Sequence, residues 1–169
     1  MKPFTPLLLS LLLTAPTGAS LAEPLAAFQP MAFLAGHCYR GELNKPGQTD
    51  THCFAWLYGG KALRDTHTVR TPNRPDFGGE TTYYYDSAAK TINYVYIEDT
   101  GGISRGTVES APGALVFPAS QYINDGETMT LRVRWTLQGE DAYEAFSEAQ
   151  GKDGAWATLF KVAFKRTAK

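Results

Sequence analysis

The sequence predicts an all-β fold, a single closed antiparallel up-and-down barrel of about ten strands with a short N-terminal helix after a signal peptide. From residue 34 onward, short segments rich in β-branched and aromatic residues are each ended by Gly, Pro, Asn or Asp, which reach turn dihedrals at low cost. No convincing helical segment interrupts them, and this even spacing favours a barrel or sandwich over alternating strands and helices. Closure removes the unpaired sheet edges.

The N-terminus has the features of a secretory signal peptide. Lys2 precedes a mostly apolar run at residues 7–13, and the small residues Ser20 and Ala22 occupy the −3 and −1 positions of a cleavage site. A membrane-spanning helix would need roughly 20 apolar residues, which this run does not reach. We therefore predict cleavage after residue 22, export to the periplasm or beyond, and no transmembrane segment in the mature chain.

The mature chain has the length of one domain with a real core. Residues 23–33 are predicted to form a short helical lid over one barrel mouth, because Pro30 limits the helix to a turn or two. Residues 34–169 then form the barrel. The predicted strands, separated by turn-forming residues, are 34–43, 50–58, 62–70, 79–86, 90–98, 103–110, 113–118, 128–138, 141–149 and 155–166.

Two late strands show one packed and one solvated face. Apolar residues alternate with Thr, Arg and Gln over 128–138, and the series from Trp156 through Phe160 to Phe164 follows the same period of two. A ring of about ten strands is wide enough to hold a ligand. The function should therefore depend on what the barrel contains.

Two cysteines occur in the chain, Cys38 and Cys53, and each follows a histidine, His37 and His52. If the first two strands form a hairpin centred on residues 45–46, the cysteines lie directly opposite each other. Facing cysteines in an exported protein most simply form a disulfide, which we predict here. A Pro-Gly turn that shifts the register by two would instead make the pair diagonal, with poorer disulfide geometry.

Side-chain alternation separates the histidines from the cysteines. Neighbouring residues of a strand point to opposite faces, which argues against a metal site built from both His-Cys pairs. The bulky series of His52, Phe54 and Trp56 suits an interior wall, so we place His37 and His52 inside. With His67 they could form a three-histidine zinc arrangement. That arrangement requires every facing assignment to hold, and we predict no metal site.

The third predicted strand carries an acid and a histidine on its inner face. Its Arg and Thr residues form a solvent-type face, which leaves Asp65 and His67 inside with Leu63 and Val69. Burying an unpaired charge costs free energy, so Asp65 and His67 should hydrogen-bond each other, another lumen group or water. His67 is therefore the best single candidate for a functional group, with a satisfied core histidine as the alternative.

Tyrosines on two consecutive predicted strands, joined by a turn at residues 86–90, form a second candidate surface. Tyr83 and Tyr85 share one face of their strand, as do Tyr94 and Tyr96. Stacked rings with hydroxyl tips can hold a flat or amphipathic ligand. Cross-strand aromatic pairs that only stabilise the sheet are the alternative interpretation.

Charged residues exclude some classes of partner. Arg105 shares a face with Ile103 and Thr107, and its guanidinium could meet an anionic headgroup inside the barrel or simply be solvated. The net charge of −1 is spread along the chain without a basic stripe, so we expect no nucleic-acid partner. A nucleophile elbow, a phosphate loop, a zinc-protease helix and a Cys-x-x-Cys motif are absent from the sequence.

The opening of the predicted barrel, residues 34–42 with the sequence LAGHCYRGE, resembles the first strand of calycin-type barrels. This group includes lipocalins, fatty-acid-binding proteins and nitrobindin-like proteins, whose first strand carries a Gly-x-Trp signature. The sequence is most similar to a secreted bacterial lipocalin-like family that opens with Phe-Leu-Ala-Gly and continues with a Gly-Gly turn and a strand ending in Arg, here Gly59-Gly60 and Arg70. Cys38 occupies the position of the signature Trp, and the resemblance by itself would place Cys38 inside.

The resemblance and the residues together predict an exported, non-enzymatic protein that holds an apolar or amphipathic molecule in its barrel. Nitrobindin-like proteins bind haem through a histidine late in the chain, and the absence of histidine after His67 disfavours haem here. One alternative is a lumen hydrolase or isomerase in which Asp65 orients His67 as a base. Another is an envelope-associated structural domain with a filled barrel. The predicted ligand contacts are His67, Tyr83, Tyr85, Tyr94, Tyr96, Arg105, His37 and His52.

Overall fold

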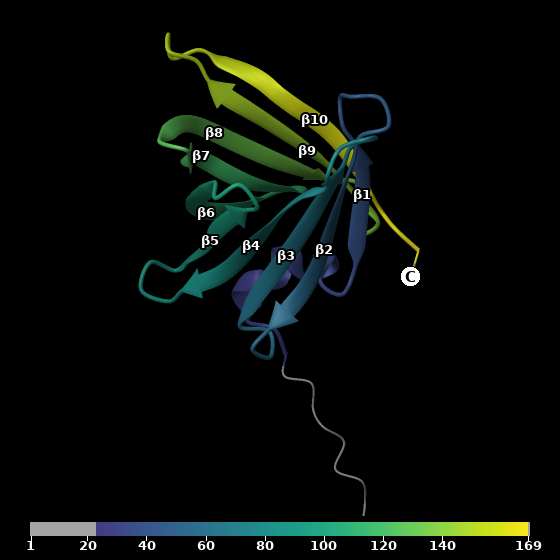
Figure 1. Cartoon of the computed structure of the whole chain (residues 1–169). Helices are drawn as coiled ribbons and strands as arrows, with labels where there is room; N and C mark the ends of the chain where they lie inside the picture. Colours follow the sequence, from purple (N-terminus) through teal and green to yellow (C-terminus); the bar gives the residue numbers. More distant parts are fainter. Residues whose placement is uncertain (1–22, 169) are drawn as a thin grey trace, which may run out of the picture.

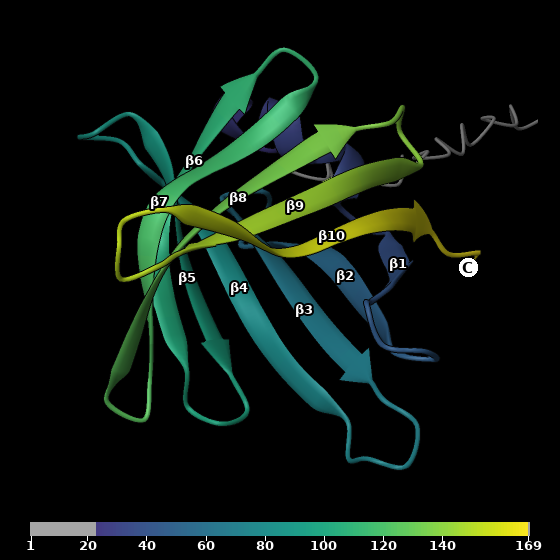
Figure 2. The same ribbon diagram turned by 90° about the horizontal axis from the view of Figure 1, so that it is seen from above.

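The computed structural model describes residues 23–168, so the predicted signal peptide lies outside the described residues. The described chain forms ten antiparallel strands that close into one barrel, each paired with its neighbours in sequence and the last with the first (Figure 1 and Figure 2). The predicted fold class is thus confirmed. The strands are β1 (Cys38–Glu42), β2 (Thr49–Leu57), β3 (Ala62–Arg70), β4 (Phe77–Asp86), β5 (Thr91–Glu98), β6 (Ile103–Ala111), β7 (Ala114–Asn124), β8 (Glu127–Leu137), β9 (Ala142–Gln150) and β10 (Trp156–Arg166).

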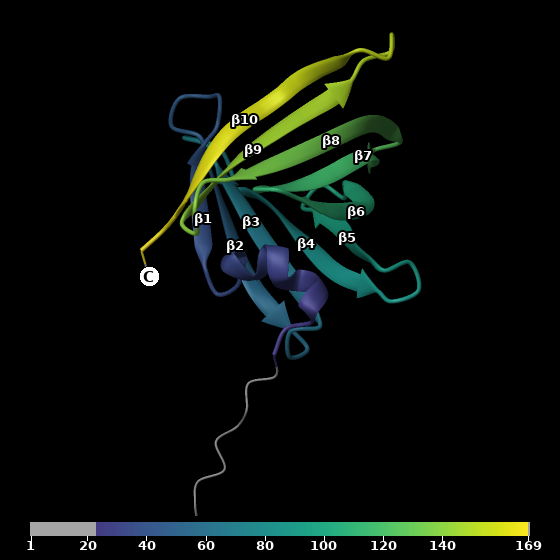
Figure 3. The same cartoon turned by 180° about the vertical axis from the view of Figure 1, so that it is seen from behind.

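A short 3-10 helix, η1 (Ala26–Leu34), lies across one end of the barrel (Figure 3). Phe28 and Met31 are fully buried, and the Phe28 ring meets Trp56 of β2 edge-on at 5.7 Å. The helix ends at Leu34 and a short turn follows, so β1 begins at Cys38 instead of residue 34. No helix in the described part of the chain is long and apolar enough to cross a membrane.

β7 continues to Asn124 instead of ending at residue 118 as predicted. Pro118 lies in an irregularity where the register between β7 and β8 shifts, between Phe117 and Ser120. Proline lacks a backbone N–H and is tolerated in a strand at such a bulge. It therefore bends the strand without ending it.

A second irregularity changes the facing of β10. The register between β9 and β10 shifts between Thr158 and Phe160, so the even alternation predicted from Trp156 to Phe164 does not hold. Phe160 faces the barrel interior, whereas the Trp156 ring lies beneath the Arg132 guanidinium of β8 at 4.3 Å. A bulge inserts one extra residue, and the faces on its two sides therefore exchange.

Aromatic side chains pack between η1 and the middle of the barrel. Trp135, Tyr143 and Phe164 stack in series with ring centroids 4.8 and 5.0 Å apart. Tyr39 of β1 packs against Tyr143, and Arg166 of β10 lies over the Tyr39 ring at 5.8 Å. These contacts hold β1 and β10 together at the seam where the barrel closes.

Cys38 and Cys53 form a disulfide between β1 and β2, as predicted. The two residues are direct partners in the antiparallel register, so the diagonal alternative does not occur. The bridge lies on the outer face of the sheet, because Tyr39, His52 and Phe54 on either side of it point into the barrel. It closes the hairpin with a sequence separation of 15 residues.

Replacing both cysteines with serine should lower the free energy of unfolding by about 3 kcal/mol, because the bridge restricts the unfolded chain over a loop of this size. Urea denaturation of the wild type and the double variant measures the difference. Reduced wild-type protein is the control and should show the same loss. An unchanged urea midpoint in both would contradict this account.

Candidate functional site

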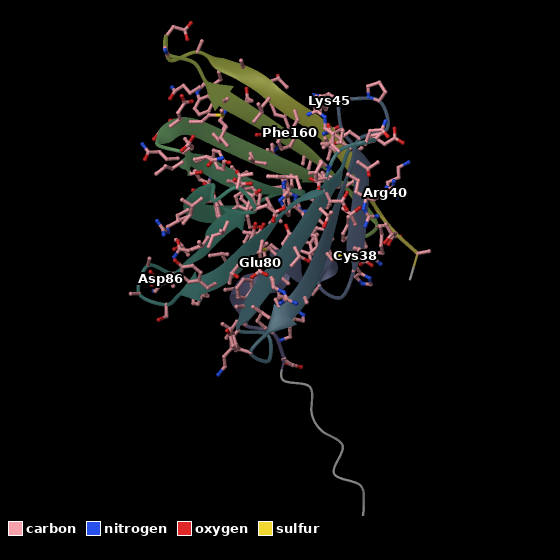
Figure 4. All side chains as sticks on the ribbon, viewed as in Figure 1. Cys38, Arg40, Lys45, Glu80, Asp86 and Phe160 are labelled. Carbon is pink, nitrogen blue, oxygen red and sulfur yellow. A yellow bond between two sulfur atoms is a disulfide. The ribbon has the colours of Figure 1, made fainter. Side chains whose placement is uncertain are left out.

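A cavity of about 370 Å³ lies in the half of the barrel remote from η1. This volume falls within the range of small-molecule sites, roughly 300–1,000 Å³. Phe160, labelled in Figure 4, forms part of the wall, whereas Arg40 and Glu80 are exposed on the outside. The lining residues are Leu43, Asp50, His52, His67, Val69, Phe77, Thr81, Tyr83, Tyr94, Tyr96, Ser104, Phe117, Pro118, Ser120, Tyr122, Leu131, Arg132, Val133, Trp135, Tyr143, Ala145, Ser147, Phe160 and Phe164.

One side of this mostly apolar cavity carries a chain of hydrogen-bonded polar residues, named the polar stripe below. The Asp65 carboxylate lies 2.8 and 3.0 Å from Nδ1 of His52. Nε2 of His52 lies 3.1 Å from Oδ2 of Asp50, and Oδ1 of Asp50 lies 3.2 Å from Nδ1 of His67. Nε2 of His67 lies 3.0 Å from the Tyr96 hydroxyl. The polar stripe therefore consists of Asp65, His52, Asp50, His67 and Tyr96.

Strand geometry brings these side chains together. Asp50 and His52 are two residues apart on β2, so they share its inner face, and Asp65 and His67 share the inner face of β3 in the same way. His52 and His67 are direct partners in the β2–β3 register, and their rings stack with centroids 5.0 Å apart. The sheet register alone thus sets the order of the polar stripe.

A glycine on β4 makes room for the last link of the polar stripe. Gly79 is the register partner of His67. A Cβ atom at this position would lie 2.8 Å from Nε2 of His67 and 2.9 Å from the Tyr96 hydroxyl. Any larger residue would therefore push apart the two groups that hydrogen-bond here.

The predicted pair of Asp65 and His67 does not form. Both ring nitrogens of His67 already have partners, Asp50 on one side and Tyr96 on the other. Asp65 bonds instead to His52, which is another lumen group and one of the alternatives left open by the sequence. The base and its orienting acid, as predicted for a lumen enzyme, are therefore not adjacent.

Mutual hydrogen bonds decide the charge states within the polar stripe. Burial alone would raise the pKa of Asp50, but hydrogen bonds from His52 and His67 outweigh it and hold the pKa well below its ordinary value. Burial alone would lower the pKa of His52, but the Asp65 and Asp50 carboxylates raise it to about 10. Burial raises the pKa of the Tyr96 hydroxyl above its ordinary range. His52 therefore carries a proton on each ring nitrogen at neutral pH, and each proton is donated to one of the neighbouring carboxylates.

Three of the four predicted tyrosines line the cavity. Tyr83 and Tyr94 are register partners whose rings lie 6.3 Å apart, and the Tyr94 hydroxyl bonds to Ser120 at 2.8 Å. Tyr96 is part of the polar stripe. Tyr85 is half-buried and packs against the core, outside the cavity lining.

Two predicted contacts lie elsewhere. His37 precedes β1 at the end closed by η1 and does not line the cavity. Arg105 is exposed on the outer face of β6. The reason is the neighbouring Gly106, which faces inward because the Tyr94 ring packs onto it, so that a Cβ there would lie 2.9 Å from that ring. Arg105 must then point outward.

Sequence reasoning missed Asp50, which bonds to both inward histidines. Its signal was its position at the start of the predicted strand 50–58, two residues before His52 and therefore on the same inner face, but Asp is uncommon in strands and was not counted among the lumen groups. Its carboxylate and the ring nitrogens of His52 and His67 place three metal-ligand atoms within 4.8 Å of one another.

Glu98 orders the rim of the cavity and was also missed. The residue is 5% exposed, and its carboxylate accepts hydrogen bonds from the Gly102 amide at 2.8 Å and the Tyr122 hydroxyl at 3.0 Å. Thr100 donates to the same carboxylate from its amide and its hydroxyl. Burial alone would raise the pKa of Glu98, but these hydrogen bonds lower it.

Because its folded pKa is lowered, Glu98 stabilises the protein above its ordinary pKa of 4.5 and loses this effect as the pH falls. Glu98→Gln should cost about 1–3 kcal/mol of unfolding free energy at pH 7. The difference from wild type should shrink as the pH falls below 4.5 and through the lowered pKa of folded Glu98, because the protonated side chain is then neutral like Gln. Denaturant titrations at several pH values measure it, with exposed Glu109→Gln as the control. A pH-independent difference would contradict the assignment.

Among solved structures, the chain is similar to the crystal structure of Rv2717c from M. tuberculosis. The TM-score is 0.59 and the sequence identity 13%, with 86% of this chain and 100% of that chain covered. No protein-family model matches the chain, and no curated protein matches it in sequence. At this identity the similarity shows the barrel fold, and the finer resemblance to calycin barrels stays a prediction.

Proposed function

We propose that the protein binds a small amphipathic molecule inside its barrel. The observation that carries this proposal is the cavity of about 370 Å³, whose wall is largely aromatic and aliphatic except for the polar stripe. Small-molecule sites combine such apolar walls with a few fixed polar groups that orient the ligand. The ligand would place its apolar body against Phe117, Trp135 and Phe160 and its polar group against His67 and Tyr96.

The charged side chains of the cavity wall disfavour a ligand with an anionic headgroup. Among the described lining residues, Arg132 is the single Lys or Arg, and its guanidinium is held by Glu148 at 2.6 Å and by the Trp156 ring. The Asp50 carboxylate faces the same cavity. An anion would therefore meet a carboxylate without a free cation to pair with. A neutral molecule with a hydroxyl or amide group fits better.

The shape of the barrel supports binding over the two alternatives. A structural domain with a filled barrel would have no cavity in the half remote from η1. The lumen enzyme loses its predicted base pair, because Asp65 bonds to His52. η1 closes one end, which leaves the opposite end, at the Glu98 rim, as the entrance for a ligand.

Filling the cavity should weaken ligand binding. Ala145 is buried and lines the cavity, so Ala145→Phe should reduce affinity for a neutral naphthylamine fluorophore at least about tenfold, equivalent to about 1.4 kcal/mol. Titration of probe fluorescence, with energy transfer from Trp135, measures the affinity.

Ala163→Phe is the matched control, since Ala163 is exposed on the outer face of the same barrel wall and should leave affinity unchanged. Ser147→Leu provides a second cavity-filling variant should Ala145→Phe fold poorly, and circular dichroism checks both. Failure of the wild type to bind the probe or any ligand retained from its host would contradict the proposal, as would equal affinity in all folded variants.

We further propose that the protein is exported. The Cys38–Cys53 disulfide supports this, because such bonds form and persist in oxidising compartments. Protein isolated from its own host should begin at Glu23 and carry the bridge, which intact-mass measurement after cell fractionation detects. A cytoplasmic chain that retains residues 1–22 would contradict the proposal.

A further inference from the structure

We propose that Asp50, His52 and His67 form a binding site for one divalent transition-metal ion in the wall of the cavity. Two imidazoles and one carboxylate are the donor set of many mononuclear zinc and non-haem iron centres. The site goes beyond the binding of an organic molecule, and it stands whether or not the cavity takes one.

The spacing of the donor atoms fits a shared ion. Asp50 oxygens lie 3.1 Å from Nε2 of His52 and 3.2 Å from Nδ1 of His67. Two atoms bound to one metal at about 2.1 Å lie about 3.0–3.4 Å apart at octahedral or tetrahedral angles. All three donor atoms lie within 4.8 Å of one another, and the torsion that turns an imidazole about its Cβ–Cγ bond has a broad minimum, so small ring rotations complete the fit.

Each imidazole has an oxygen partner for its second ring nitrogen, as metal-ligating histidines require. Nδ1 of His52 faces the Asp65 carboxylate and keeps its proton there, whereas the Nε2 proton donated to Asp50 is the one that a metal ion would displace. Nδ1 of His67 donates to the Asp50 carboxylate, and Nε2 lies beside the Tyr96 hydroxyl, which can accept the ring proton when a metal ion takes the Nδ1 lone pair. Metal-ligating histidines almost always donate their second N–H to such an oxygen.

The charge of the site also matches a divalent cation. Asp50 and Asp65 contribute two negative charges, and their side chains are only 11% and 3% exposed. With two neutral imidazoles, a divalent ion brings the cluster to zero net charge. Buried carboxylates are stabilised when a cation pairs with them. The ion replaces the proton that otherwise lies between His52 and Asp50.

The donor types narrow the choice of metal. Imidazole nitrogen suits Zn²⁺, Fe²⁺ and their neighbours, whereas Mg²⁺ and Ca²⁺ prefer oxygen donors alone. Three protein ligands leave coordination positions free, and Asp50, His52 and His67 all line the cavity, so these positions face the space where a small molecule can lie.

Equilibrium dialysis of the chelator-treated mature protein against Zn²⁺, followed by elemental analysis, should give one ion per chain, and Co²⁺ should give visible absorption bands of a bound ion. Asp50→Asn and His67→Gln should abolish stoichiometric binding. Asp65→Asn and Tyr96→Phe, which alter only the outer partners, should weaken affinity about 10- to 100-fold. His37→Gln removes the one histidine outside the cavity and should bind as the wild type does.

A measurement on the unaltered protein keeps the test decisive if a ligand variant folds poorly. Bound Co²⁺ should shift or broaden the NMR resonances of the His52 and His67 rings and leave those of His37 unaffected. Absence of stoichiometric binding by the wild type, or binding that survives Asp50→Asn and is lost in His37→Gln, would overturn the proposal. Probe titration of the same samples is separate, so loss of metal binding with intact probe binding overturns the metal site alone.

Discussion

Alternation of side chains along β2 and β3 is the constraint on which the rest of this structure depends. Because each strand in a closed barrel has one inner and one outer face, the alternation that turns Cys53 outward to meet Cys38 also turns His52 inward, where the β2–β3 register sets it opposite His67. A shift of one residue would turn all of these side chains to the other face. The disulfide therefore holds β2 in register with β1 and keeps Cys53 outward, which maintains the inward facing of Asp50 and His52 on the same strand.

Different interactions stabilise the two halves of the barrel interior. Next to η1, packed rings such as Trp56 and Tyr39 fill the space, and burial of apolar area stabilises the fold. In the other half, the carboxylates of Asp50 and Asp65 are largely buried. Their burial is tolerated because each accepts hydrogen bonds. Asp65 alone would be costly, but both of its oxygens contact His52. Stability is concentrated in the first half and specific chemistry in the second.

The sequence was sufficient for the fold and for part of the site. Turn residues and alternation predicted the strands, the disulfide and the inward facing of His52 and His67, because these follow from local geometry. The Pro118 irregularity and the reversal of β10 before Phe160 were not predictable, since a bulge leaves no distinct local pattern. Alternation within β2 is enough to turn Asp50 inward with His52, but its bond to His67 and the outward place of Arg105 depend on neighbouring strands, which alternation within one strand does not reveal.

The seam between β1 and β10 has a consequence for incomplete chains. It joins residues as far apart as Tyr39 and Arg166, so the ring can close only when the last strand is present. A chain that ends before β10 leaves β1 and β9 with unpaired edges, and such edges act as templates for aggregation. β1 is short, at five residues, and is already tied to β2 by the disulfide, so the longer edge of β9 is the more exposed of the two hazards.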